Sequence, residues 1–233
     1  MSEYVFTPPP VTSLAIAGDA RRFPVRRIFC AGRNYADHII EMGGAPDAAP
    51  PVIFTKPPDA LVCDGADVSY PRATRELHHE IELVLTLNIQ GAKPLRDADE
   101  VQAAQAIFGI AAGVDLTRRD MQAAAKKAGA PWAAAKGFAA SAPIGAITPL
   151  AAPPGPVQGP ISLAVNGQIR QDGDLAQMLW QPARLLSYIS TLFDLHSGDL
   201  VFTGTPAGVG PLRRGDQVQG KVAGTAGVAF KVV

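Results

Sequence analysis

The chain has 233 residues, which is long enough for one large domain with a sizeable core. Hydrophobic residues make up 47% of the sequence and charged residues 18%, a composition that excludes disordered and fibrous proteins. The 21 basic side chains balance 21 acidic ones, whereas a nucleic-acid binder would show a basic surplus. Any attraction for a charged ligand must therefore be local.

Cys30 and Cys63 lie in apolar runs without metal-binding or redox spacing, so we expect ordinary core cysteines. The first ten residues contain neither the basic nor the apolar segment of a secretory leader. Asp, Arg, Gly or Pro interrupts every apolar run before it reaches the length of a membrane span. The sequence therefore predicts a soluble, cytoplasmic protein that binds neither membranes nor nucleic acid.

The first half of the chain has the pattern of short strands separated by turns. Residues 1–25, rich in proline and small residues, are expected to form an extended arm, and residues 26–233 a single catalytic domain. Apolar residues at helical spacing predict a helical patch between Tyr35 and Met42. Short apolar runs predict strands over residues 27–31, 52–55 and 79–87.

The second half continues with short elements and ends in strands. Asn166-Gly167 between apolar pairs predicts a β-hairpin, and residues 110–116 form a candidate buried strand. The tail from residue 198 alternates strands with glycine turns. Helices are predicted over residues 98–108, 117–128 and 182–195. Because strands dominate and no βαβ alternation is present, we expect an α+β domain that is mainly β.

The segment from His79 to Leu85 alternates between acidic and apolar residues. In a strand, Glu80 and Glu82 point to one face, and the apolar residues between them point to the other. Two adjacent carboxylates repel each other, and a metal ion between them removes that cost. The pair is therefore either a metal site or the solvated face of an amphipathic strand, although apolar Val84 on the same face disfavours solvent.

Asp115 ends the apolar run of residues 109–114, where a charged side chain is rarely left unpaired. It is a candidate metal ligand or catalytic group, or alternatively the cap of the helix that follows. With Glu80 and Glu82 it would make an all-oxygen ligand set, which suits Mg²⁺ or Mn²⁺ better than Zn²⁺. Zinc is the weaker alternative, because the neighbouring His78 and His79 point to opposite faces of a strand.

His38 and Glu41 lie three residues apart in the predicted helical patch and so share one helical face. The carboxylate would orient the imidazole, which could then take a proton from water at neutral pH. The alternative is a surface contact without a catalytic role.

A glycine-rich segment, residues 203–210, follows a predicted strand. Its glycines allow the backbone to approach a ligand and to present amide donors to a carboxylate, or else form a pair of tight turns. The segment lacks the Gly-Lys-Ser/Thr ending of a phosphate-binding loop, which argues against a nucleotide. Elsewhere, Arg119, Gln122 and Lys136 are candidate hydrogen-bond donors toward an oxyanion.

Taken in chain order, these motifs resemble the fumarylacetoacetate hydrolase family. The resemblance covers nearly the whole chain from about residue 26, and the phrases at residues 26–30 and 116–120 look most like the fumarylpyruvate hydrolase, or acylpyruvase, branch. The segments that carry it are Phe29–Tyr35, Phe54–Pro57, Leu77–Glu82, Gly113–Thr117, Lys136–Phe138, Val165–Gly167 and Gly198–Gly210.

The resemblance implies a mixed β-sandwich roll with short peripheral helices, assembled as a homodimer. It implies Mg²⁺ or Mn²⁺ on Glu80, Glu82 and Asp115, with His38 and Glu41 as a water-activating pair. The residues that it implies around the substrate are Arg33, Tyr35, Arg119, Gln122, Lys136 and Thr205.

The implied reaction is hydrolysis of a carbon–carbon bond in an acylpyruvate, for example fumarylpyruvate from gentisate breakdown, which would give fumarate and pyruvate. The metal would act as a Lewis acid on the 2-oxo acid, His38 would deprotonate water, and the nearby donors would stabilise the oxyanion. Two alternatives are oxaloacetate decarboxylation or enol–keto isomerisation of a 2-oxo acid on the same metal site, and a catalytically silent 2-oxo-acid-binding protein. The combination of His38 and Glu41 with the three acidic residues argues against the silent protein.

Overall fold

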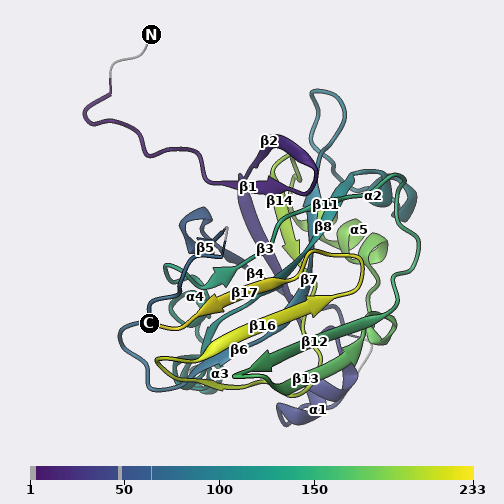
Figure 1. Cartoon of the computed structure of the whole chain (residues 1–233). Coiled ribbons are helices and arrows are strands. Elements are labelled where there is room, and N and C mark those ends of the chain that lie inside the picture. The colour runs from purple at the N-terminus through teal and green to yellow at the C-terminus, as the bar shows by residue number, and fades with distance from the viewer. Residues whose placement is uncertain (1–3, 47–48, 64) are drawn as a thin grey trace.

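The computed structural model describes residues 4–46, 49–63 and 65–233, which are built around two large β-sheets (Figure 1). The larger sheet is mixed, because β14 runs parallel to β3 while its other strand pairs are antiparallel. Its strand order is β11 (Thr148–Pro149), β8 (Ile107–Val114), β7 (Ile81–Leu87), β14 (Asp199–Phe202), β3 (Arg27–Gly32), β4 (Val52–Lys56). The second sheet is antiparallel, with the order β13 (Gln168–Asp174), β12 (Pro160–Val165), β16 (Gln217–Val222), β17 (Val228–Lys231).

Smaller sheets surround these two. One contains β15 (Gly210–Leu212), β6 (Leu77–His79) and β9 (Thr117–Arg118). The other two are strand pairs, the hairpin of β1 (Ser13–Ile16) with β2 (Asp19–Pro24), and the parallel pair of β5 (Leu61–Val62) with β10 (Ala142–Pro143).

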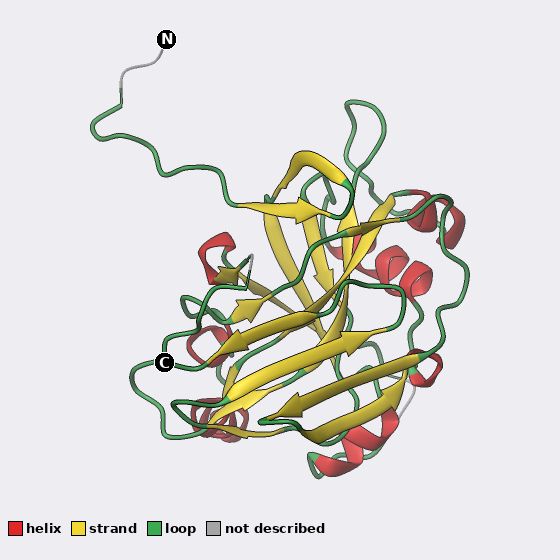
Figure 2. Cartoon of the chain, in the orientation of Figure 1, coloured by secondary structure: helices red, strands yellow, loops and turns green. Residues whose placement is uncertain are grey.

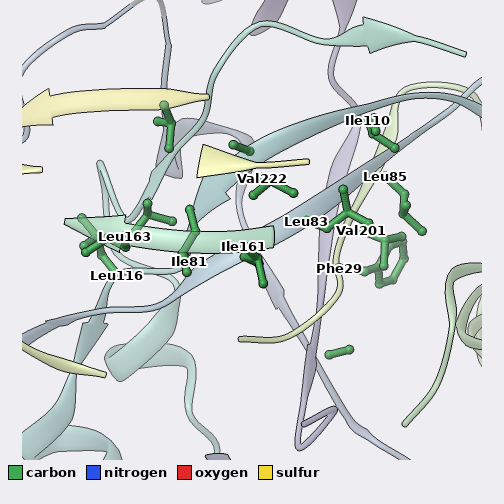
Figure 3. Packing of buried hydrophobic residues seen from close by; sticks show 14 of the residues in the cluster. Phe29, Ile81, Leu83, Leu85, Ile110, Leu116, Ile161, Leu163, Val201 and Val222 are labelled. Carbon is green, nitrogen blue, oxygen red and sulfur yellow. The ribbon is translucent and has the colours of Figure 1, made fainter. Parts of the chain in front are cut away.

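The main hydrophobic core lies between the two large sheets (Figure 3). Ile81, Leu83 and Leu85 of β7 face this core, and Ile161 and Leu163 of β12 belong to the same cluster. Each of these side chains is fully buried, which stabilises the fold by roughly 1.5–3 kcal/mol per residue. The alternation fixes the register of β7, because a slip by one residue would turn its apolar side chains out of the core.

The opposite face of the six-stranded sheet is buried as well. Val84 of β7 packs there in a second cluster with Leu14 and Phe23 of the β1–β2 hairpin. The extended arm predicted for residues 1–25 is therefore wrong for its second half, which folds back as two strands and covers the sheet. The prolines of residues 8–10 dominate the composition of this region and obscure the short apolar alternation that follows them.

The α-helices of the described residues are short and lie outside the sheets (Figure 2). They are α1 (Ala36–Glu41), α2 (Glu100–Gln105), α3 (Arg119–Ala128), α4 (Ala133–Lys136) and α5 (Pro182–Leu192), with 3₁₀ turns η1 (Pro58–Ala60) and η2 (Leu175–Gln177). Asp99 caps α2 in a capping box, and Gly129 ends α3 in the left-handed conformation. None of the described helices is long and apolar enough to span a membrane.

The predicted helix boundaries differ from the structure where strand pairing competes with helix formation. The helix predicted over residues 98–108 stops at Gln105, because β8 already begins at Ile107. The helix predicted from residue 117 begins two residues later, since Thr117 and Arg118 pair with β6 as β9. The β-hairpin is confirmed, with Asn166 and Gly167 at φ values of 52° and 77° between β12 and β13.

Candidate active site and metal centre

Three buried carboxylates meet at one point in the fold. One ligand oxygen of each of Glu80, Glu82 and Asp115 lies within 4.8 Å of the others. The exposed fractions of these residues are 5%, 2% and 0%. Because ionised carboxylates are not buried side by side without positive charge, this cluster needs cations.

A break in two paired strands brings Glu80 and Asp115 together. β6 pairs with β9, and beyond the break β7 pairs with β8. Glu80 lies between β6 and β7, Asp115 follows β8, and the Asp115 backbone N–H donates a 2.8 Å hydrogen bond to the Glu80 carbonyl. The single strand predicted for residues 79–87 is thus divided at Glu80. His79 belongs to β6 in the three-stranded sheet, and the residues after Glu80 form β7 in the six-stranded sheet.

Two buried lysines balance part of the negative charge. Lys136 Nζ lies 2.8 Å from Glu80 Oε2 and 2.6 Å from Asp115 Oδ2. Lys56 Nζ lies 2.9 Å from Asp115 Oδ1, and it also donates to Ser141 Oγ at 2.9 Å. Lys56 was absent from the predicted site residues. Lys56 lies in the segment Phe54–Pro57, which carries part of the family resemblance, but its position at the end of a strand followed by two prolines does not specify burial.

The charge balance differs between the two glutamates. Burial opposes ionisation of Glu80, but Lys136 and Arg119 overcome it and lower the pKa of this carboxyl. Burial raises the pKa of Glu82 well above its ordinary value, and the negative charges of Asp115 and Glu80 raise it further. A divalent cation beside Glu82 would supply the missing positive charge, and carboxylate oxygens are ligands that hard ions prefer. The residues present therefore fit Mg²⁺ or Mn²⁺.

Hydrogen-bond donors from α3 lie beside the carboxylates. Arg119 Nη2 forms an ion pair with Glu80 Oε1, and Arg119 Nη1 donates to Gln122 Oε1 at 2.5 Å. Both side chains are nearly buried, and they share one face of the helix because they lie three residues apart. Arg119, Gln122 and Lys136 thus border the same space, and their role as donors to the substrate stays a prediction.

His38 and Glu41 lie on α1 at the other side of this space. His38 Nδ1 is 3.1 Å from Glu41 Oε2, and Glu41 Oε1 accepts a 3.0 Å hydrogen bond from the Gly208 backbone N–H. The carboxylate is thus fixed at both oxygens, so it can hold the imidazole in one orientation. The predicted pair is in contact, and its role as a water-activating dyad stays a prediction.

The glycine-rich segment is held close to α1 and to the metal carboxylates. The Gly204 backbone N–H donates a 2.7 Å hydrogen bond to Glu82 Oε2. Gly204 has φ of 96°, and a Cβ there would lie 2.8 Å from Asn34 Cβ, so a larger residue does not fit. Asn34 Nδ2 in turn donates to the Thr203 carbonyl at 2.7 Å. Thr205, which follows, is buried and borders the same space.

These groups line one cavity of about 310 Å³. His38, Arg33 and Thr205 line it together with the three carboxylates, and Phe54 and Trp132 form an apolar part of its wall. Its other lining residues include Arg119, Gln122, Lys126 and Lys136. Tyr35, which was predicted to contact the substrate, belongs to the hydrophobic core instead and is 2% exposed.

Comparisons with known proteins show which family the chain resembles. The fumarylacetoacetate (FAA) hydrolase C-terminal family matches residues 27–233. Oxaloacetate tautomerase FAHD1 of Bos taurus is 40% identical over 207 residues, which cover 89% of this chain and 91% of that protein. Oxaloacetate tautomerase YcgM of Escherichia coli is 43% identical over 197 residues, which cover 84% and 88%.

A solved structure extends the similarity to the whole fold. The crystal structure of fumarylpyruvate hydrolase from Pseudomonas aeruginosa, in complex with Mn²⁺ and pyruvate, superposes with a TM-score of 0.93. It is 42% identical in sequence, and the match covers 99% of each chain. The chain therefore belongs to the fumarylacetoacetate hydrolase family, and the predicted α+β roll, mainly β with short peripheral helices, is confirmed.

Proposed function

We propose that this protein is a metal-dependent hydrolase that cleaves a carbon–carbon bond of an acylpyruvate, with fumarylpyruvate as the preferred substrate. The observation that carries the proposal is that His38, oriented by Glu41, lines the same cavity as the three carboxylates. Hydrolysis needs a base that activates water as well as a group that binds the 2-oxo acid, and one cavity offers both. The similarity to the fumarylpyruvate hydrolase of P. aeruginosa supports the choice of substrate.

The chain's own residues divide the steps of this reaction. A divalent ion on Glu80, Glu82 and Asp115 would supply Lewis acidity to the oxygens of the 2-oxo acid. His38 takes a proton from a water molecule, which attacks the carbonyl carbon farther from the 2-oxo acid, and Glu41 stabilises the imidazolium that forms. The bond between that carbon and the neighbouring CH₂ then breaks, leaving an acid and the enol form of pyruvate.

The oxyanion that develops during the attack needs donors. Gln122 and Arg119 border the cavity from α3, and Lys136 borders it from α4. Preorganised donors of this kind stabilise the transition state more than the substrate, because the negative charge exists only there.

The two oxaloacetate tautomerases favour a second candidate, enol–keto exchange of oxaloacetate on the same carboxylates. That reaction moves a proton between carbon and oxygen, and it needs no water nucleophile. Loss of His38 should therefore impair enol–keto exchange less than it impairs hydrolysis.

The two candidates are separated by product analysis. The purified protein with Mn²⁺ is incubated with fumarylpyruvate and, separately, with oxaloacetate. Loss of the enol absorbance is followed in each reaction. The products are then separated by chromatography. Equal amounts of fumarate and pyruvate support the hydrolase. Rapid interconversion of the oxaloacetate enol and keto forms without cleavage of fumarylpyruvate would replace it with the tautomerase.

A further inference from the structure

One face of α3 connects the metal carboxylates with the far end of the cavity. Arg119, Gln122 and Lys126 all line the cavity and are spaced at i, i+3 and i+7, so they follow one another along that face. Arg119 is bonded to Glu80 at the metal end. At about 1.5 Å of rise per residue, Lys126 lies roughly 10 Å farther along the helix axis.

Lys126 differs from the other cavity lysine in its partners. Lys136 is bonded to two of the carboxylates, whereas within the described part of the chain no carboxylate is in salt-bridge contact with Lys126. The Lys126 ammonium lies 5.4 Å from the centroid of the Trp132 ring. Partial loss of solvent lowers the pKa of Lys126, although the residue as a whole is exposed, and the positive charge of Arg119 adds to this effect. An anion beside this lysine would relieve that electrostatic cost.

The wall between the two ends of the cavity is apolar. Phe54 and Trp132 both line it, with their ring centroids 5.8 Å apart. The cavity thus offers a hard-cation site at one end, an aromatic surface beside it and an exposed ammonium at its edge. This sequence of environments suits an unsaturated or aliphatic chain with a negative group at each end.

We propose that Lys126 binds the second carboxylate of the substrate, so that the cavity favours 2-oxo acids that carry a distal carboxylate over those that end in an apolar group. An extended chain gains roughly 1.2 Å per bond, so the six bonds between the two carboxyl carbons of fumarylpyruvate span about 7 Å. With a hydrogen bond of about 3 Å at each end, such a ligand is long enough to cover the rise of roughly 10 Å from Arg119 to Lys126. This inference rests on the proposed function and specifies its substrate class.

The test uses binding, so that it does not depend on turnover. The Mn²⁺-loaded full-length protein is titrated by calorimetry with 2-oxopimelate and with 2-oxoheptanoate, which have the same chain length and differ in the distal carboxylate. We expect 2-oxopimelate to bind about tenfold more tightly, as for one hydrogen-bonded charged contact. Lys126→Met should remove this preference and leave the affinity for 2-oxoheptanoate unchanged, which also shows that the variant is folded.

Lys127→Met is the matched control, because Lys127 is the next residue on α3, is exposed and is not among the residues that line the cavity. It should keep the preference for 2-oxopimelate. Equal affinities of the unmodified protein for the two ligands, or a preference that survives in Lys126→Met, would overturn the inference. Since neither ligand has a second carbonyl to be attacked, the result stands apart from the proposed hydrolysis, which fails only if fumarylpyruvate is not cleaved.

Discussion

Gln171 Nε2 donates a 2.8 Å hydrogen bond to Thr205 Oγ1 in the glycine-rich segment. The Oε1 atom of the same amide accepts a 3.0 Å hydrogen bond from the Ile81 backbone N–H and lies 2.9 Å from His79 Nδ1. This fully buried side chain of β13 therefore joins the strands that carry the metal carboxylates to the segment that borders the substrate space.

We expect Gln171→Leu to raise KM and to lower kcat/KM by about ten- to a hundredfold, because a lost contact of this kind costs about 1–3 kcal/mol when its buried partners stay unpaired. Steady-state kinetics on fumarylpyruvate measure the effect, and thermal unfolding measures the accompanying loss of stability. Gln168→Leu, at an exposed position of the same strand, should behave like the unmodified protein. Unchanged kinetics in Gln171→Leu would show that Thr205 needs no such support.

His38→Ala should keep the metal and lose hydrolysis by roughly 10²–10⁴-fold, the usual contribution of a general base. Glu41→Gln should lose less, since an amide oxygen can still accept the Gly208 N–H but carries no charge to stabilise an imidazolium. Turnover is compared with Mn²⁺ affinity from calorimetry for each variant. A His38→Ala protein that hydrolyses fumarylpyruvate at the normal rate would remove this pair from the mechanism.

Metal binding should stabilise the fold, because the three ligands come from separate segments of the chain that meet only in the folded protein. At a free metal concentration a hundred times Kd, the gain is about 2.7 kcal/mol, which appears as a higher Tm. Chelator should reverse the shift and abolish turnover. Glu82→Gln should show little shift, whereas Glu76→Gln, an exposed acid, should respond as the unmodified protein does. A Tm that is insensitive to Mn²⁺ would contradict the assignment of these ligands.

Lys56→Met should lower the free energy of unfolding by about 3–5 kcal/mol, the usual cost of leaving one charge of a buried pair without its partner. Lys56 contacts Asp115 and also donates to Ser141 Oγ and to the carbonyls of Leu116, Lys136 and Ser141, so five acceptor atoms lose their donor. Urea denaturation measures the change, with Lys221→Met, at an exposed position on β16, as the control. A loss below 1 kcal/mol would mean that water replaces this ammonium.

The acidic cluster could be predicted from sequence because each ligand breaks a local pattern. Glu80 and Glu82 alternate with apolar residues and Asp115 ends an apolar run, so all three were candidate ligands from neighbours within a few residues. The local pattern left a solvated face open for the two glutamates, and the family resemblance favoured the metal site. The same local reasoning predicted contact between His38 and Glu41, which share one helical turn. The homodimer implied by the family resemblance stays a prediction.

The residues that sequence reasoning missed depend on distant partners. Lys56 is buried because β4 pairs with β3 and lies beside Asp115, 59 positions away in the printed sequence. Gln171 follows a hairpin turn among exposed polar residues, and nothing near it indicates that β6 and β7 cover it. Substrate contact by Tyr35 was implied by the family resemblance alone, whereas its ring packs in the core and it is not among the residues that line the cavity.

The passage of paired strands from one sheet to the next, at Glu80 and Asp115, anchors the metal ligands in the main framework of the fold. The helix α3 lies beside these carboxylates, and Arg119 at its start is bonded to Glu80. Within the described part of the chain, Lys126 farther along the same helix lines the cavity without a salt bridge to any carboxylate. Side chains along this helix can therefore be exchanged, by selection or by engineering, to change which substrates bind. The geometry of the metal ligands stays the same. Members of one family can then differ in substrate specificity while they keep the same catalytic chemistry.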